Sequence, residues 1–364
     1  MKLIKVNTAL KSYPVFIGSN IFESLPELMK KYNLPRQVFI ILDKNLVRIY
    51  GSSIRKVINK FASKKYFLTL PASERVKSFE TVDQIFIRLY EEKFSRDTLL
   101  IAIGGGTIGD VSGFAASTYM RGIPLIHIPT TLLSAVDSSI GGKTGINFNE
   151  AKNLIGTFYQ PSLVLIDTSF LKSLPEEELI SGFGEVVKYS YLTDGELYSR
   201  LISDNDLLIK KELGFFNKTI YESVKIKSTV VSKDEFEISG LRKILNFGHT
   251  FAHAFESASG YNLSHGKAVI AGIISALSLS FEMGFISEKQ FNFMLELPLK
   301  FKSTIQLKNI NEKEILRLME YDKKNSEDEI KFVLVKNFGE ILVDVAADRM
   351  LIYQALKRTK RVLV

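Results

Sequence analysis

The sequence predicts an α/β domain followed by a mainly helical domain. In the first part of the chain, short apolar runs such as Gln37–Leu42 and Thr98–Ile103 alternate with stretches of helical period. This alternation is typical of an open parallel sheet with helices on both faces. From Leu174 onward the apolar residues recur mainly at helical spacing. We therefore expect an α/β domain at residues 1–172 and a helical domain at residues 173–364.

The individual elements are expected in the following order. Two short strands fill residues 1–17, and a helix of about 15 residues follows the buried strand Gln37–Leu42. Four further strands are expected at Tyr66–Leu70, Thr98–Ile103, Leu125–Ile128 and Leu163–Ile166, with a helix near Ser78–Phe94. The helical part comprises PEEELISGFGEVVKYSYL, FFNKTIYESVKIKSTVVSKDE and the histidine-bearing stretch Arg242–Lys267. A late hairpin, Ile330–Val335 with Glu340–Val345, precedes a last helix.

Composition limits the classes of protein to consider. A chain of 364 residues, 46% hydrophobic and 24% charged, is typical of a globular protein with two substantial cores. The net charge of +8 would suit nucleic acid or a small anion, but the lysines are dispersed rather than gathered in a run. The lack of cysteine excludes disulfides and thiolate metal ligands. With no signal-peptide core and no apolar run of membrane-spanning length, we expect a cytoplasmic protein that binds neither membrane nor nucleic acid.

A glycine-rich turn is the first candidate binding element. GGGTIGD, Gly104–Asp110, follows the strand Thr98–Ile103 and should open a helix, whose N-terminus favours a pyrophosphate. The acid found roughly 20 residues later in the usual dinucleotide fingerprint is absent, because that region reads LIHIPTT. Asp43, at the end of an earlier strand, could hold a ribose hydroxyl instead. A tight turn with a purely structural role is the alternative.

The segment Ile128–Pro161 has little periodicity, and we expect a long functional loop there. Its charged and amide side chains include Asp137, Lys143, Lys152 and Asn153. Lysines beside hydroxyls and backbone amides suit a phosphate, although either lysine alone would more often be a solvated surface charge. Together with the glycine turn, the segment indicates phosphate binding.

Three of the four histidines fall within 26 residues, which favours a metal site over satisfied core histidines. At helical period, one polar stripe contains Arg242, Asn246, His249, His253 and Glu256. Gly260 and Asn262 should then end the helix before His265. Spacing alone would pair His249 with His253, because ligands four residues apart share a helix face.

Glu185 is a candidate third ligand. It stands three residues before Lys188 in the apolar segment SGFGEVVKYS. As a surface ion pair these two residues would contribute little. In a cleft, Glu185 would complete the three nitrogen and oxygen ligands of a catalytic zinc, which keeps a position for water or substrate. Thr250 follows His249 where an HExxH protease has Glu, so a metalloprotease is excluded.

Ordered motifs along most of the chain resemble the 3-dehydroquinate synthase family. They read GGGTIGD, YMRG, PTTLLSAVDSSIGGKTG, KNLIGTFYQP, GEVVKY, LNFGHTFAHAFE, LSHG and MEYDKK. The resemblance implies a Rossmann-like NAD-binding domain with a mainly parallel sheet, a helical metal-binding domain, an active site in the cleft between them, and a homodimer. Gly184 and Ser190 stand where the family usually has Ala and Gly, and one extra residue lies between Lys227 and Arg242.

The resemblance also assigns roles to residues. It implies the metal ligands Glu185, His249 and His265, with His253 facing the substrate, and so overrules the pairing suggested by spacing. The implied NAD+ contacts are Asp43, Glu74, Lys77, Gly106, Thr107, Ile108, Gly109, Asp110, Thr130, Thr131, Lys143, Lys152, Phe170, Leu171, Lys172 and Ser173. The implied catalytic residues are Lys143, Lys188, Lys227, Arg242, Asn246 and His253. Further substrate contacts are Arg121, Asp137, Lys152, Asn153 and one of Lys323 and Lys324.

The implied activity is that of a carbon–oxygen lyase of the shikimate pathway, which leads to the aromatic amino acids. It would convert 3-deoxy-D-arabino-heptulosonate 7-phosphate to 3-dehydroquinate and phosphate, using NAD+ and one Zn²⁺ or Co²⁺. NAD+ would oxidise the C5 hydroxyl transiently and be regenerated. Two alternatives remain: another sugar-phosphate cyclase, such as a 2-deoxy-scyllo-inosose or valiolone-type synthase, and a glycerol-dehydrogenase-like polyol oxidoreductase, whose substrates need no phosphate cradle.

Overall fold

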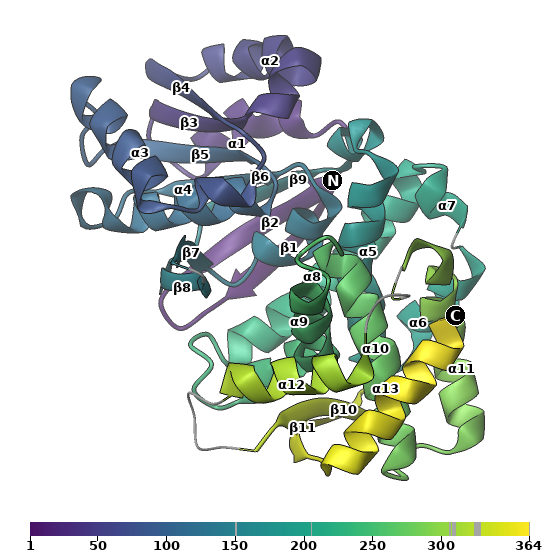
Figure 1. Ribbon diagram of the computed structural model, residues 1–364. Helices are drawn as coiled ribbons and strands as arrows, with labels where there is room; N and C mark the ends of the chain where they lie inside the picture. Colours follow the sequence, from purple (N-terminus) through teal and green to yellow (C-terminus); the bar gives the residue numbers. More distant parts are fainter. Residues whose placement is uncertain (150, 205, 306, 308–310, 324–328, 364) are drawn as a thin grey trace. The chain divides into compact units, whose positions relative to one another are not determined.

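The computed structural model describes residues 1–363 apart from 150, 205, 306, 308–310 and 324–328. The chain folds into two compact units, each made of two segments (Figure 1). Unit 1 consists of Met1–Leu174 and Lys211–Phe236, and unit 2 consists of Pro175–Lys210 and Glu237–Val364. The segment Lys211–Phe236 therefore groups with unit 1 although it follows the predicted boundary at residues 172 and 173. That boundary stays a prediction.

Unit 1 contains the mainly parallel sheet that the sequence predicted. In spatial order its strands are β1 (Lys2–Asn7), β2 (Ser12–Gly18), β9 (Leu163–Asp167), β6 (Leu125–Pro129), β5 (Thr98–Gly104), β3 (Gln37–Asp43) and β4 (Lys64–Leu70). Only β1 and β2 pair antiparallel within this sheet. Strands β5, β6 and β9 are buried at every position, which explains why they read as continuous apolar runs.

Helices cover both faces of this sheet. Side chains of β3 alternate between the faces, as strand geometry requires. Val38 and Ile40 belong to the apolar cluster that includes residues of α1 (Leu25–Lys31) and α2 (Lys44–Asn59). Phe39 and Ile41 belong to the cluster that includes α3 (Phe79–Glu91) and α4 (Gly106–Thr118). Unit 1 also contains α8 (Leu213–Lys233), which packs against β1 and β2.

The prediction of one long loop at Ile128–Pro161 is wrong. The segment contains a π-helical turn, Ser134–Ser138, and a separate hairpin of β7 (Lys143–Phe148) and β8 (Ala151–Phe158). The sequence hides this hairpin because β8 has no buried residue and so shows no apolar alternation. Lys143, Lys152 and Asn153 therefore lie on a defined piece of sheet, while Asp137 lies in the π-helical turn.

Unit 2 is mainly helical, as predicted. Its helices are α5 (Glu176–Tyr191), α6 (Glu196–Ser203), α7 (Asp206–Ile209), α9 (His249–Ala258), α10 (His265–Glu282), α11 (Glu288–Leu299), α12 (Glu312–Lys323) and α13 (Arg349–Leu363). The predicted late hairpin is formed by β10 (Lys331–Asn337) and β11 (Glu340–Ala346). Helix α10 is buried from Ala268 to Ser280 and contacts α5, α9, α11, α13 and β10. A helix that is apolar all round is expected at such a centre.

The polar stripe predicted from Arg242 to Glu256 is not one continuous helix. Arg242 lies in a 3-10 turn, Leu241–Asn246, and α9 begins only at His249. Between them Gly248 has a φ of 80°, and a Cβ there would lie 2.8 Å from the backbone nitrogen of Ile273. Close packing against α10 therefore requires glycine and interrupts the helix.

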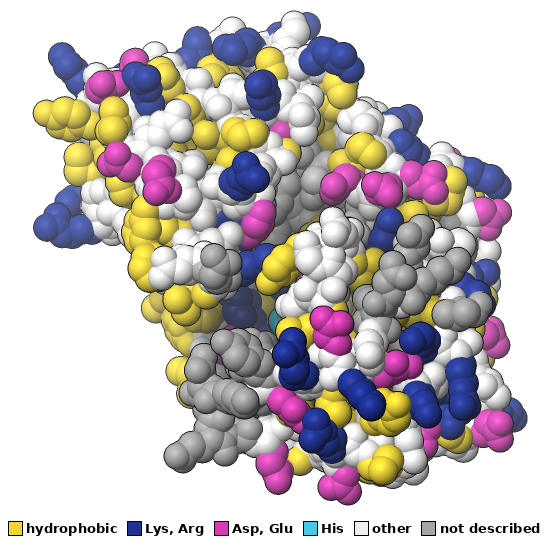
Figure 2. All heavy atoms as spheres, viewed as in Figure 1, with side chains coloured by type: hydrophobic (Ala, Val, Ile, Leu, Met, Phe, Trp, Pro, Cys, Tyr) yellow, Lys and Arg dark blue, Asp and Glu magenta, His cyan; other side chains and the backbone are white. Residues whose placement is uncertain are grey.

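Among the described residues, no helix has both the length and the apolar character needed to cross a membrane. On the face shown in Figure 2, Lys and Arg side chains are interspersed with Asp and Glu. The positive net charge is thus dispersed on that face.

Candidate metal centre and nucleotide site

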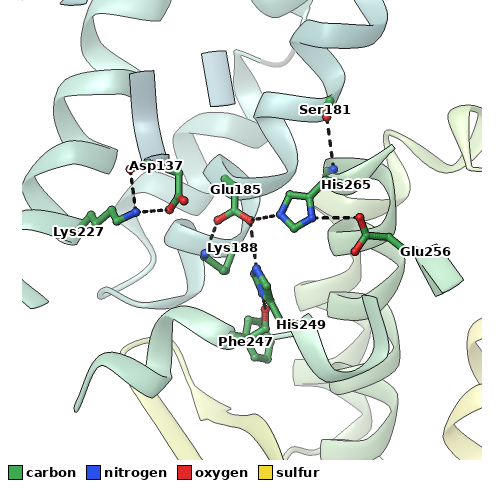
Figure 3. A network of polar contacts seen from close by, with 10 residues as sticks. Asp137, Ser181, Glu185, Lys188, Lys227, Phe247, His249, Glu256 and His265 are labelled. Atoms are coloured by element: carbon green, nitrogen blue, oxygen red, sulfur yellow. Dashed lines mark hydrogen bonds and ion pairs between the residues drawn. The ribbon is translucent and has the colours of Figure 1, made fainter. Parts of the chain in front are cut away.

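Three side chains from three helices of unit 2 converge on one point. Glu185 lies in α5, His249 is the first residue of α9, and His265 is the first residue of α10. One donor atom from each lies within 4.8 Å of the other two. Figure 3 shows the carboxylate of Glu185 facing both imidazoles. His253, which spacing had paired with His249, is outside this group, and their ring centroids are 5.7 Å apart.

The distances from Glu185 to the two imidazoles fit a tetrahedral cation. Ligand bonds of about 2.0–2.2 Å at tetrahedral angles place neighbouring donor atoms roughly 3.3–3.6 Å apart. Glu185 Oε1 lies 3.4 Å from Nε2 of His249 and 3.3 Å from Nε2 of His265. Both oxygens of Glu185 are buried without a hydrogen bond of normal geometry: Oε1 faces the two imidazoles, and Oε2 is ion-paired with Lys188. A divalent metal would satisfy Oε1, so the donor set fits one.

The outer nitrogens of the two imidazoles have partners of their own. Nδ1 of His249 lies 3.3 Å from the carbonyl oxygen of Phe247, and Nδ1 of His265 lies 3.5 Å from Glu256 Oε1. Acceptors at these positions keep the proton on Nδ1 when a metal binds, so that Nε2 of each ring can be the ligand atom. The sequence assigned no role to Glu256, although its place two turns after His249 on the same polar stripe was the available signal.

Charge within the cluster is balanced by neighbours. Lys188 forms a buried ion pair with Glu185. Burial acts to raise the pKa of Glu185, but Lys188 and the two imidazoles outweigh it and hold that pKa well below its usual range. Burial acts to lower the pKa of His265, but Glu185 and Glu256 outweigh it and raise that pKa to about 10. In the metal-free protein His265 therefore carries a proton that a metal would have to displace.

Two glycines let the helices that carry the ligands approach closely. Gly184 precedes Glu185, and Gly266 follows His265. A Cβ on Gly266 would lie 1.7 Å from the carbonyl oxygen of Ser181, and one on Gly184 would lie 2.3 Å from the carbonyl oxygen of Gly266. Backbone meets backbone here, so no side chain fits without moving α5 away from α10.

In unit 1 the glycine turn opens α4, as predicted. Gly105 is the N-cap, and a Cβ on Gly104 would lie 2.8 Å from the side chain of Ile108. Packing alone therefore accounts for Gly104, while the amides that begin α4 still suit an anion. Asp43 caps α2 by accepting a hydrogen bond from the amide of Asn45 at 2.9 Å. Burial raises the pKa of Asp43.

Several predicted NAD+ contacts gather at one edge of the sheet in unit 1. Asp43 ends β3, and the glycine turn begins as β5 ends at Gly104. The amide of Thr130, directly after β6, donates to the carbonyl of Gly104 at 3.0 Å. The segment Phe170–Ser173 follows β9 in a 3-10 turn. These strands are parallel, so their carboxyl ends share one edge, where ligands bind in open α/β sheets.

Two other predicted contacts belong to unit 1. Arg121 lies apart from the glycine turn, and Lys227 has a partner within the protein. Arg121 follows the far end of α4, whose 13 residues span roughly 20 Å. Met120 and Arg121 have φ of 51° and 66°, an uncommon conformation for both. Lys227 is buried and donates to Asp137, with distances of 2.7 Å to Oδ1 and 2.8 Å to the carbonyl oxygen.

The remaining predicted substrate contacts belong to unit 2. Arg242 is buried, with its Nε 3.5 Å from Oε1 of Glu237, a residue that sequence reasoning did not single out. Asn246 and His253 are exposed. Lys324 lies outside the described residues, and Lys323 is the last residue of α12.

Comparison with known proteins identifies the family. Sequence models of the N-terminal and C-terminal parts of 3-dehydroquinate synthase match residues 67–181 and 182–325. The 3-dehydroquinate synthase of Pelagibacter ubique is 41% identical over 345 residues, which are 92% of each chain. The chain belongs to the 3-dehydroquinate synthase family.

Solved structures of related cyclases share the fold. A 2-deoxy-scyllo-inosose synthase, complexed with carbaglucose-6-phosphate, NAD+ and Co²⁺, has a TM-score of 0.88 at 25% identity, covering 98% of this chain and 99% of that chain. The 2-epi-5-epi-valiolone synthase of Streptomyces hygroscopicus, with NAD+ and Zn²⁺, has a TM-score of 0.85 at 25% identity and covers 96% and 97%. The predicted fold class is confirmed.

Proposed function

We propose that the protein is a 3-dehydroquinate synthase that converts 3-deoxy-D-arabino-heptulosonate 7-phosphate to 3-dehydroquinate and phosphate. The observation that carries the proposal is the cluster of Glu185, His249 and His265 in a chain of this family. Its three nitrogen and oxygen donors suit a catalytic Zn²⁺ or Co²⁺. The two related cyclases named above were solved with NAD+ and one of these metals.

The cofactor sites follow from residues already described. Glu185, His249 and His265 would hold the metal, and the carboxyl edge of the sheet in unit 1 would hold NAD+. When bound, the metal supplies a Lewis acid for neighbouring hydroxyls, and NAD+ supplies a hydride acceptor that is regenerated. Lys188, buried beside Glu185, keeps that carboxylate ionised and so available as a ligand.

Cationic side chains would bind the two anionic groups of the substrate. Lys143 and Lys152 are exposed on the hairpin of β7 and β8, where they can reach a phosphate. Arg242 offers a planar fork that suits the substrate carboxylate. Lys227 is held by Asp137, so a substrate carboxylate that binds Lys227 must share this lysine with Asp137 or replace that residue. His253 is exposed at the surface of α9, where it can exchange protons between a reacting hydroxyl and water.

A substrate panel tests this proposal against its nearest rival. We expect phosphate release from the heptulosonate phosphate, with 3-dehydroquinate as the product, and negligible release from glucose 6-phosphate or a heptulose 7-phosphate. Those two substrates lack the carboxylate that Arg242 would bind. Release from either, with none from the heptulosonate phosphate, would move the activity to another sugar-phosphate cyclase. Net NADH formation from a simple polyol would contradict the cyclase altogether.

From the family we further expect a homodimer in the cytoplasm. Sedimentation should then give twice the chain mass of 41.1 kDa. A species at the mass of one chain, at micromolar protein concentration, would contradict the dimer.

A further inference from the structure

The hairpin of β7 and β8 is irregular where it carries two predicted substrate contacts, Lys152 and Asn153. Between regular pairs on either side, the three residues Lys152–Leu154 of β8 face the single residue Asn147 of β7. Asn153, at the centre of this bulge, has a φ of 54°. Bulges turn side chains away from their regular directions and are frequent beside active sites. The bulge therefore decides where Lys152 and Asn153 point.

The side-chain amide of Asn147 ties this bulge to a different segment of unit 1. Its Oδ1 accepts a hydrogen bond from the backbone nitrogen of Asn153 at 2.8 Å. Its Nδ2 donates to Glu74 Oε1 at 3.0 Å. A backbone N–H only donates and a carboxylate only accepts, so these partners fix the orientation of the amide. The backbone nitrogen of Asn147 also donates to the carbonyl of Lys77 at 2.8 Å.

Lys77 makes a second link between the same segments. Its side chain is buried, lies 2.8 Å from Asp110 Oδ2 and also donates to Asn153 Oδ1. Asp110 belongs to the helix that the glycine turn opens. Glu74, Lys77 and Asp110, all predicted NAD+ contacts, thus form one network with the bulge. Asn147 is the member of this network to which no role has been assigned.

We propose that Asn147 is a positioning residue that couples NAD+ binding to the geometry of the phosphate-binding hairpin. The inference rests on the proposed function. Asn147 holds Glu74 on one side and sets the backbone of Asn153 on the other. When NAD+ orders Glu74 and Lys77, the same bonds order the bulge that presents Lys152 and Asn153. Because coupling between two binding sites is reciprocal, phosphate must tighten NAD+ by the factor by which NAD+ tightens phosphate.

Two substitutions separate the two sides of this link. Asn147→Ala removes both bonds, so the NAD+ Kd and the substrate KM should each rise about 10-fold. Asn147→Asp keeps an oxygen that accepts from the backbone nitrogen of Asn153. It replaces the donor to Glu74 with a second carboxylate, which Glu74 repels. The NAD+ Kd should therefore rise more than the substrate KM. A role in stability alone would not produce this difference between the two variants.

The coupling itself is measured with NAD+ and inorganic phosphate. In the unsubstituted protein, phosphate should lower the NAD+ Kd, and in Asn147→Ala this effect should disappear. Amide hydrogen exchange at Asn153 should be fast in Asn147→Ala and remain slow in Asn147→Asp. The double variant Glu74→Gln/Asn147→Asp restores the bond with donor and acceptor exchanged. It should bind NAD+ more tightly than Asn147→Asp alone.

The matched control is Asn149→Gly in the turn of the same hairpin. Asn149 has a φ of 52°, which glycine adopts freely, and its side chain makes none of the bonds described above. The control should keep both constants within twofold. Unchanged constants and unchanged exchange in Asn147→Ala, or equal losses in the control, would overturn the proposal. An inactive unsubstituted protein would instead count against the proposed function, while the exchange and NAD+ measurements would still decide the role of Asn147.

Discussion

The metal cluster of unit 2 and the anion-binding region of unit 1 are prepared for their ligands in different ways. Around the metal cluster, Glu185 lies within ion-pair distance of Lys188, His249 and His265. Along the hairpin of unit 1, Lys143 and Lys152 are exposed. Opposite charges can be assembled and buried before the ligand arrives, because they stabilise one another. An exposed cation needs no such buried assembly, because water screens its charge.

This comparison predicts that substitutions in the metal cluster cost metal, while substitutions on the hairpin cost substrate affinity. The largest effect is expected for His265→Ala, which should abolish metal binding and nearly all turnover. Its Kd for NAD+ should be unchanged. Metal content per chain, measured by mass spectrometry after dialysis, checks this. The matched control, Lys267→Ala, should retain the metal. Zinc at full occupancy in His265→Ala would refute the assignment of this ligand.

The helix contact beneath the cluster should be the next most sensitive point. Gly266→Ala places a methyl group against the carbonyl of Ser181, and overpacking of this kind typically costs about 1–3 kcal/mol of stability. Because α5 and α10 carry Glu185 and His265, separating them should also weaken metal binding. Thermal unfolding with and without added Zn²⁺ measures both effects. A variant with unchanged Tm and unchanged metal affinity would show that the helices do not need this contact.

The carboxylate behind His265 should have a smaller effect. Glu256→Gln weakens the acceptor for Nδ1, and loss of such an outer partner typically lowers metal affinity about 10- to 100-fold. Competition with a chelator of known affinity gives the metal Kd. Glu177→Gln is the control, because Glu177 lies in the same unit on an exposed ion pair with Lys267. Equal metal affinity in the two variants would remove Glu256 from the metal site.

Metal binding should depend on pH through His265. With its pKa raised to about 10 in the metal-free protein, this group must lose a proton when metal binds. The apparent metal affinity should therefore rise about tenfold per pH unit below that pKa. The same raised pKa stabilises the metal-free protein fully below the ordinary histidine pKa of about 6.5, and this contribution is lost as pH rises through about 10. Chelator competition at pH 7, 8 and 9 measures the affinity, and equal affinities would contradict the mechanism.

The hairpin should give the smallest effect on stability. Lys152→Met removes an exposed cation, so Tm should change by no more than about 1–2 °C, while the substrate KM should rise about 10-fold through one lost charge-assisted contact. Lys5→Met, an exposed lysine on β1, serves as the control for charge alone. An unchanged KM for Lys152→Met would place the phosphate elsewhere.

Periodicity in the sequence predicted the sheet of unit 1 because its central strands are buried on both faces. It missed β7 and β8 because β8 is exposed, and exposed strands carry no apolar signal. Periodicity also wrongly extended the helix of His249 back to Arg242. The helix is interrupted at Gly248 by tight packing against α10, and this packing depends on residues far along the chain. Local patterns carry no information about such contacts.

The metal ligands show the same limit more sharply. Spacing favoured His249 with His253, because it compares positions within one helix. The candidate ligands instead come from three helices. Sequence reasoning had proposed Glu185, but only the resemblance to a family put His265 in place of His253. Gly266 had no visible role in the sequence, and the only signal for Glu256 was its place on the polar stripe. Their partners, Ser181 and His265, are set by packing of α5, α9 and α10.

The most direct test of the central claim is to return metal to chelator-stripped protein and follow phosphate release and NADH absorbance together, with NAD+ present. We expect no release from the stripped protein, full release at one Zn²⁺ or Co²⁺ per chain, and no accumulation of NADH. Full activity without metal would contradict the role of Glu185, His249 and His265. NADH that accumulates in step with product would contradict the transient oxidation on which the proposed activity depends.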